Sequence, residues 1–208
     1  MPVTRSKGFT LIEIAIVITI IGMLMVGVTK VMTSLIQSAK VSSAITLAQD
    51  ISVAVNAFKQ QYHMLPGDMV IDPTNPEISN VRNDCWKGSN KGNNDGLING
   101  NEPLCVPEVL FQAGLAKVDR DSNGFAVFQT SYGPVSVIAT SLSAVGAGKF
   151  PPSIIHVVEF QNLPCDVAIS IDSKMDDGDT TNGNVKSSPP CVSGASGIPA
   201  TTTLDVPL

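Results

Sequence analysis

The stretch from Phe9 to Thr29 decides the fold, and it reads Phe-Thr-Leu-Ile-Glu-Ile-Ala-Ile-Val-Ile-Thr-Ile-Ile-Gly-Met-Leu-Met-Val-Gly-Val-Thr. Glu13 is its one charged residue. About 20 apolar residues in succession are enough for a helix to cross the hydrocarbon core of a bilayer. We therefore predict a transmembrane helix at residues 9–30.

A short basic segment precedes this helix. Residues 1–8 include Arg5 and Lys7 and end in Gly8. In an ordinary secretory signal the small residue at the cleavage site follows the apolar stretch, whereas here it comes first. This order does not fit removal of the apolar part, so a cleavage at the small residue would remove a leader of residues 1–8 and keep the helix. By the positive-inside rule the leader lies in the cytoplasm, and cleavage after Gly8 would give Phe9 a free amine.

Glu13 needs an explanation, because a carboxylate in a membrane helix costs a few kcal/mol and usually has a partner. One interpretation is that Glu13 lies close enough to the interface to reach water. The other, which we favour, is that a second chain supplies the partner charge. In that case Glu13 of one subunit neutralises the Phe9 amine of its neighbour inside a packed bundle.

Residues 7–13 read Lys-Gly-Phe-Thr-Leu-Ile-Glu, and an unbroken apolar helix follows. The string resembles the prepilin processing motif of type IV pilins and type II secretion pseudopilins. The resemblance implies that a prepilin peptidase cuts after Gly8 and methylates Phe9, and that Glu13 guides subunit docking. Its implied partners are other pilin subunits, the peptidase and an inner-membrane assembly platform. Many members have a proline late in this helix, where this chain has Lys30.

The resemblance to a bacterial pilin-like subgroup continues more loosely beyond the helix, in four short motifs. They lie at residues 62–68, at residues 94–96 together with Glu102, at residues 113–115 and at residues 176–178.

Apolar residues recur at spacings of three and four after the membrane segment, which predicts an amphipathic helix. They are Ala44, Leu47, Ala48, Ile51, Ala54, Val55, Phe58 and Tyr62. No proline interrupts the chain from Phe9 to Leu65, and Pro66-Gly67-Asp68 is typical of a helix end. We therefore predict one helix from about Phe9 to about Tyr62. Residues 31–65 form its amphipathic part and pack on a globular head, residues 66–208.

Strands in the head are predicted at residues 125–131, 134–140 and 153–160, which are rich in Val, Ile and Phe. Residues 165–175 fit either a strand or a helix, and the family resemblance favours the helix. The predicted fold class is α+β, with a long N-terminal helix packed on a small antiparallel sheet, pilin-like.

Less regular structure is expected elsewhere in the head. Residues 67–104 are rich in Asp, Asn, Pro and Gly, which predicts a long loop with turns. Pro107 suits the start of a short helix. The tail after Ser187 is expected to be partly irregular.

Four cysteines follow the membrane segment: Cys85, Cys105, Cys165 and Cys191. With the leader in the cytoplasm they face an oxidising compartment, which favours disulfides. Three pairings are possible, and chain order favours Cys85–Cys105 and Cys165–Cys191. A zinc site is the weaker alternative, because the chain has no Cys-x-x-Cys motif.

Two loops are candidates for calcium. Residues 91–102 place Asn, Asp, Gly and Glu as an EF-type loop does, but Lys91 stands where a carboxylate is needed. The second loop concentrates hard oxygen donors, namely Asp172, Asp176, Asp177, Asp179 and Asn182. A solvated acidic turn is the interpretation we favour for it, and Ca²⁺ binding is the alternative hypothesis.

Composition narrows the function. The 208 residues carry a net charge of -5, which argues against a basic nucleic-acid-binding face. The sequence has no catalytic or phosphate-binding motif, so we expect no enzyme.

We predict a structural subunit that polymerises into a type IV pilus-like filament for adhesion, motility or DNA uptake. The alternatives are a type II secretion pseudopilin and a membrane-anchored, calcium-dependent binding module. Before assembly the chain would lie in the inner membrane as a single-pass protein with a cytoplasmic N-terminus. It would then enter an extracellular pilus or a periplasmic pseudopilus.

Overall fold

The computed structural model of the chain describes residues 8–70, 78, 80–86, 88, 90–146, 148–192 and 199–208. The chain forms two compact units, Met1–Lys40 and Val41–Leu208, and we describe each by itself. Helix α1 (Leu11–Tyr62) contributes to both units. The predicted long N-terminal helix is confirmed, and it starts two residues later than expected because Thr10 precedes it as a cap.

The two parts of α1 differ in their apolar character. Among the described residues, Met32–Tyr62 is the helical segment that is long and apolar enough to cross a bilayer by length and composition. Leu11–Met25 is a shorter apolar segment. The large apolar side chains from Leu11 to Met25 are exposed, whereas the stripe after Lys40 is buried in the head. The placement of the membrane span at residues 9–30 therefore remains a prediction.

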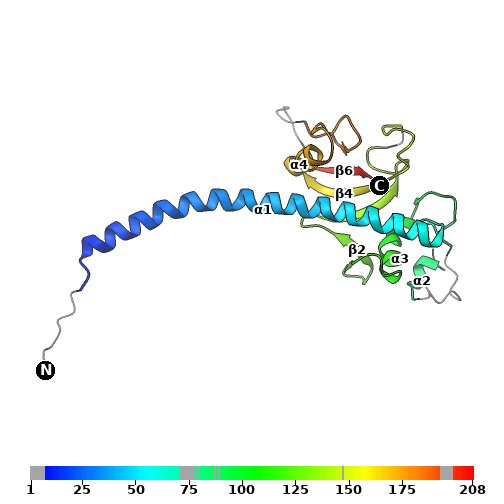
Figure 1. The fold of residues 1–208 in the computed structure, drawn as a ribbon, viewed down its shortest axis with the longest axis horizontal. Coiled ribbons are helices and arrows are strands. Elements are labelled where there is room, and N and C mark those ends of the chain that lie inside the picture. The colour runs from blue at the N-terminus through cyan, green and yellow to red at the C-terminus, as the bar shows by residue number, and fades with distance from the viewer. Residues whose placement is uncertain are drawn as a thin grey trace, which may run out of the picture. The chain divides into compact units, whose positions relative to one another are not determined.

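The described part of the head contains one antiparallel sheet with the strand order β1-β2-β3-β4-β6-β5, of which β2, β4 and β6 are labelled in Figure 1. Its strands are β1 (Asp119–Arg120), β2 (Ala126–Gln129), β3 (Pro134–Ala139), β4 (His156–Pro164), β5 (Lys186–Ser188) and β6 (Thr201–Pro207). β4 is central, because it pairs with β3 on one side and with β6 on the other. The predicted α+β, pilin-like fold is confirmed.

The C-terminal tail is more regular than the sequence predicts, because it contains β6. This strand pairs with β4 through partners such as Val158 with Val206 and Glu159 with Asp205. β6 begins with three threonines, whose branched side chains fit the surface of a sheet. Because threonine is polar, this strand does not appear in the sequence as an apolar run.

Four short helices complete the head as far as its residues are described. They are α2 (Asn83–Trp86), the 3-10 helix η1 (Glu102–Leu104), α3 (Val106–Gln112) and α4 (Cys165–Met175). α2 and η1 lie in the region predicted to be a loop, and α3 starts at Val106, one residue before the expected Pro107. Residues 165–175 are helical, as the resemblance favours, and α4 follows Pro164 directly.

The core of the head joins the amphipathic part of α1 to the sheet and the short helices. Its residues on α1 are Val41, Ala44, Ala48, Ile51, Ala54, Val55 and Phe58. They share one cluster with strand residues such as Phe128, Val158 and Leu204. The predicted stripe is thus buried, with Leu47 and Tyr62 partly buried at its edge. Each fully buried aliphatic or aromatic side chain contributes about 1.5–3 kcal/mol by burial.

Candidate functional site

Reciprocal hydrogen bonds between Thr10 and Glu13 close the start of α1. The Glu13 backbone N–H donates to Thr10 Oγ1 at 3.3 Å. In return, Glu13 Oε2 accepts from the Thr10 backbone N–H and from its hydroxyl, both at 2.9 Å. This is a capping box, in which a Thr and the Glu three residues later satisfy each other's backbone donors.

The capping box gives Glu13 a partner within its own chain. The Thr-x-x-Glu spacing from Thr10 to Glu13 is the sequence signal for it, and our sequence interpretation did not use that signal. In the single subunit the carboxylate of Glu13 is bonded to Thr10, the residue that follows Phe9. Pairing of Glu13 with the Phe9 amine of a second subunit therefore remains a prediction.

The described apolar side chains around this cap face outward. The large ones are Phe9, Leu11, Ile12, Ile14, Ile16, Val17, Ile18, Ile20, Ile21, Met23, Leu24 and Met25. Exposure reaches 93% at Leu11 and 84% at Phe9. Contiguous apolar surface of this kind marks contact with a membrane or with other protein chains. Gly8 borders the same surface, and a Cβ built on it would have no atom within 4 Å.

In the head, the motif after α1 contacts the motif at residues 94–96. Asp68 is buried and accepts hydrogen bonds from the backbone N–H groups of Asp95 (3.1 Å) and Gly96 (2.9 Å). The approach is close, because a Cβ at Gly92 would overlap the backbone of Asp68. These motifs therefore serve to fix the loop to the end of α1.

Glu102 has a similar role in the loop at residues 91–102. Its Oε1 accepts from the Asn93 N–H at 3.2 Å, and its Oε2 accepts from the Asn99 N–H at 2.8 Å. Burial raises the pKa of Glu102, and the Asn99 N–H opposes the rise. Both carboxylate oxygens of Glu102 thus accept hydrogen bonds from the backbone. Glu102 is therefore not available as the last calcium ligand of an EF-type loop.

The structure joins Cys85 to Cys105 and Cys165 to Cys191. This is the pairing that chain order favours. The first disulfide connects α2 to the residue before α3, and the second connects the start of α4 to the chain after β5. No cysteine remains free, since all four belong to the described residues.

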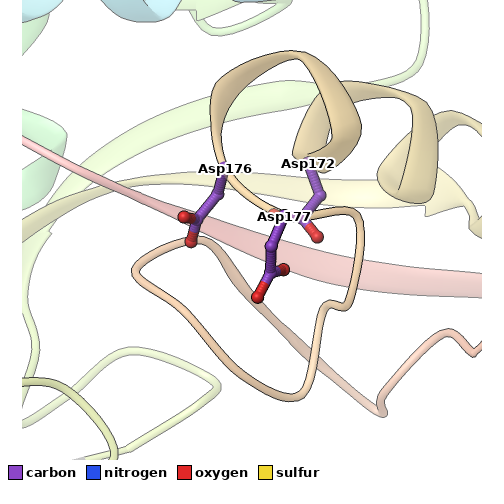
Figure 2. A group of neighbouring side chains, drawn as sticks. All are labelled: Asp172, Asp176 and Asp177. Carbon is purple, nitrogen blue, oxygen red and sulfur yellow. The ribbon is translucent and has the colours of Figure 1, made fainter.

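The acidic loop after α4 brings three of its five predicted donors together. Oxygens of Asp172, Asp176 and Asp177 lie within 4.8 Å of one another. Figure 2 shows the three side chains at the end of α4, extending toward the loop that follows it. Asp179 is not part of this group, and Asn182 Nδ2 donates to Asp179 Oδ2 at 2.7 Å. Asp179 Oδ1 accepts from the Thr181 N–H at 3.0 Å.

Asp172 is the unusual member of this group. It is fully buried, and neither carboxylate oxygen has a hydrogen-bond partner among the described residues. Burial raises the pKa of Asp172 to about 6, with further contributions from the negative charges of Asp177 and Asp176. The Gly178 N–H has the smallest effect on this pKa and lowers it. This N–H does not meet the geometry of a hydrogen bond to the carboxylate.

Another buried carboxylate with a strongly raised pKa lies in the sheet, where the sequence gives no signal for it. Asp205 of β6 is fully buried and stands opposite Glu159 of β4, which is also buried. Burial raises the pKa of Asp205 to about 7, and the charge of Glu159 adds to the rise. Hydrogen bonds from the Ser143 side chain and the Val145 N–H oppose it.

A comparison with protein families places the N-terminal segment. The family model of the prokaryotic N-terminal methylation motif matches residues 3–29. Neither a curated protein nor a solved structure matches the chain. The motif is the signature of precursors that prepilin peptidase processes and that polymerise, a structural class of protein. The chain thus carries, together with a pilin-like fold, the processing signature of a type IV pilin or pseudopilin precursor.

Proposed function

We propose that the chain is a pilin, a structural subunit of a type IV pilus-like filament used for adhesion, motility or DNA uptake. One observation carries the proposal. The methylation motif lies at the start of a helix whose large apolar side chains from Leu11 to Met25 are exposed, as is that of Phe9 just before it. A surface of this kind requires cover, by lipid before assembly and by the helices of other subunits after it.

The membrane stage follows from the same segment. An apolar N-terminal helix with this motif is consistent with membrane anchoring before assembly. We place the leader, residues 1–8, in the cytoplasm, residues 9–30 in the inner membrane and the head outside. The two disulfides of the head support this orientation, because disulfides persist in oxidising compartments.

Glu13 would set the register of assembly. After cleavage, the charged amine of Phe9 needs a counter-charge, and Glu13 of an adjacent subunit provides one. A buried ion pair adds little net stability once its desolvation is counted, so its contribution here is to the choice of docking position. The capping box keeps the Glu13 carboxylate at the helix start, close to the surface where a neighbour would dock.

Processing is tested with two glycines on the exposed segment. A Cβ at Gly8 or at Gly22 would have no neighbour within 4 Å, so replacement of either by Val introduces no clash within the chain. In cells that contain prepilin peptidase, Gly8→Val is expected to keep the leader. Gly22→Val is the matched control and is expected to be cleaved. Intact-mass measurement of the wild-type chain should give an N-methylated Phe9.

Retention of Met1 by the wild-type chain in such cells would refute the proposal. A pseudopilin of a type II secretion system would share the cleavage but not the surface fibres. Electron microscopy of cells that express the cleaved chain distinguishes the two, because the pilin proposal requires fibres that contain this subunit outside the cell.

A further inference from the structure

The end of α4 gathers negative charge where a helix is already negative. Asp172 lies in the last turn of α4, Asp176 is its C-cap and Asp177 follows. The C-terminal end of a helix carries partial negative charge, so carboxylates there are unfavourable without a counter-charge. With oxygens within 4.8 Å of one another, these three also repel each other.

Asp172 makes the arrangement more costly. Its side chain is fully buried, and both oxygens lack hydrogen-bond partners among the described residues. Asp68 shows how this chain treats another buried carboxylate, since it accepts from the N–H groups of Asp95 and Gly96. Buried charges in proteins are paired, hydrogen-bonded or bound to metal ions. The first two solutions are missing for Asp172 in the part of the chain that the structure describes.

The nearby lysines are used elsewhere. Lys174, on the same turn of α4, donates from Nζ to Ser42 Oγ at 3.3 Å. Lys186 donates from Nζ to the Thr181 carbonyl at 3.4 Å. Within the described residues, the salt bridges involve other carboxylates than the three at the end of α4. No basic side chain of the described residues is thus seen in a salt bridge with these three carboxylates, and a bound cation would supply a counter-charge.

The loop holds the two exposed carboxylates in place while keeping oxygens available. Asp176 Oδ2 accepts from the backbone N–H groups of Asn184 and Val185. Asp177 Oδ1 accepts from the Asp179 N–H at 2.9 Å. The hydrogen bonds described for these residues thus leave Asp176 Oδ1 and Asp177 Oδ2 free to bind, besides both oxygens of Asp172.

The rest of the loop is fixed independently of any ligand. The Cys165–Cys191 disulfide joins the start of α4 to the chain beyond β5, which encloses the acidic group in one covalent loop. Gly183, at a φ of 68°, approaches so closely that a Cβ there would overlap the carboxylate of Asp176. Carboxylates held in this way need little reorganisation to bind an ion.

We propose that Asp172, Asp176 and Asp177 bind a calcium ion. Ca²⁺ takes six to eight oxygen ligands at about 2.3–2.6 Å, so ligands on opposite sides of one ion lie about 5 Å apart. The 4.8 Å limit within which these oxygens lie agrees with that separation. Mg²⁺ requires a stricter octahedron and usually binds one or two carboxylates, so it fits three converging carboxylates less well. Water would complete the shell on the exposed side of Asp176 and Asp177.

The first test is a Ca²⁺ titration of the full-length protein in detergent, by calorimetry and by thermal melting. Extracellular calcium modules bind with dissociation constants of about 10⁻⁴–10⁻³ M. At about 5 mM Ca²⁺ such an affinity raises the melting temperature of a protein of this size by about 2–8 °C. MgCl₂ at the same concentration and KCl at the same ionic strength are expected to give smaller shifts. An equal shift with either salt would overturn the assignment to calcium.

Three variants identify the ligands. Asp172→Asn removes the buried charge, so its ion-free form is expected to melt higher than the ion-free wild type and to show no calcium-dependent rise. Asp177→Asn changes an exposed ligand, does not threaten folding and is expected to weaken Ca²⁺ binding at least about tenfold. Asp179→Asn is the matched control, because it removes the same charge from the same loop without removing a proposed ligand.

The outcomes separate a specific site from a general acidic loop. Weakening by less than about threefold in Asp179→Asn, with loss of binding in the other two variants, supports the proposal. Equal weakening in all three variants would overturn it, as would a wild-type protein that neither binds Ca²⁺ in the calorimeter nor melts higher with it. The test does not depend on filament formation, so it can fail or succeed independently of the proposed function.

Discussion

The two parts of α1 belong to one continuous helix and have opposite surroundings. From Leu11 to Met25 the large described apolar side chains are exposed, whereas from Val41 to Phe58 the apolar stripe is buried in the core of the head. The first part is apolar on every face, so no single domain packed against one side could cover it. The second part is amphipathic, and one side of it is covered by the same chain.

The two parts of the helix therefore contribute to two different processes, the folding of the subunit and its anchoring and assembly. Burial of the amphipathic part stabilises the fold of the subunit, because it occurs within one chain. Burial of the apolar part needs lipid or other subunits, so its hydrophobic free energy is available for anchoring and assembly. Substitutions in the two parts are therefore expected to affect different measurements.

The largest expected effect is on assembly. Glu13→Ala is expected to leave cleavage and the fold of the head intact and to abolish filaments, because the Phe9 amine of the next subunit loses its counter-charge. Filament yield in sheared fractions, checked by electron microscopy, measures the effect. Thr10→Val is the matched control, because it breaks the capping box but keeps the carboxylate of Glu13.

The control decides which role of Glu13 matters. If Thr10→Val assembles far better than Glu13→Ala, the carboxylate acts between subunits. If both variants lose filaments equally, Glu13 acts only as the cap of its own helix, and the intersubunit pair is wrong. Normal yield from Glu13→Ala would exclude both roles.

A matched pair of isoleucines tests the contrast on stability. Ile51 is 1% exposed in the head and Ile18 is 62% exposed near the N-terminus. Truncation of a buried isoleucine to alanine removes about 2–5 kcal/mol of unfolding free energy, so Ile51→Ala should lower the stability of the head by that amount. Ile18→Ala should leave it unchanged within about 0.5 kcal/mol. Chemical denaturation of the detergent-solubilised protein measures both, and equal losses would contradict the division.

pH is expected to act on the head in a definite direction. The pKa of Asp205 is about 7 in the folded chain, against an ordinary value of 3.8 for an aspartate, so the folded state binds more protons between these limits. The unfolding free energy therefore falls as pH rises from about 4 to about 7, by up to about 4 kcal/mol. Asp172 contributes a dependence of the same sign.

Asp205→Asn removes the larger of these two contributions. The variant is expected to show a smaller loss of stability across this range and to exceed the wild type most at pH 7 and above. Denaturant midpoints at a series of pH values measure the difference. A variant whose stability depends on pH as strongly as the wild type would show that Asp205 does not titrate in this window.

Local patterns in the sequence predict much of this fold. The spacing of Ala44, Ile51 and Phe58 is enough to predict the helix and its buried face. The Val-rich runs are enough to predict the central strands. Residues that depend on distant parts of the chain are harder to assign. Asp205 becomes a buried carboxylate only because β6 pairs with β4, and the threonines that begin β6 give no apolar run.

The candidate sites show the same limit. Chain order is enough to favour the two disulfide pairs, because each closes a nearby loop. The four aspartates of the acidic loop look equivalent in sequence, yet among them only Asp172, Asp176 and Asp177 converge. The turn that directs Asp179 toward Asn182 depends on backbone geometry that spacing does not specify. Glu13 differs from these cases, because the local Thr-x-x-Glu spacing is sufficient to predict its capping box from the sequence.

The two edge strands of the sheet, β1 and β5, are built in a way that disfavours strand pairing between closely packed subunits. β1 has two residues and β5 has three, and both include a basic side chain, Arg120 and Lys186 respectively. Short, charged edge strands are poor templates for another strand. In a filament of the proposed kind the heads are at very high local concentration, and their edge strands would not pair readily with those of neighbouring heads. Contacts between helices would then determine how neighbouring subunits pack.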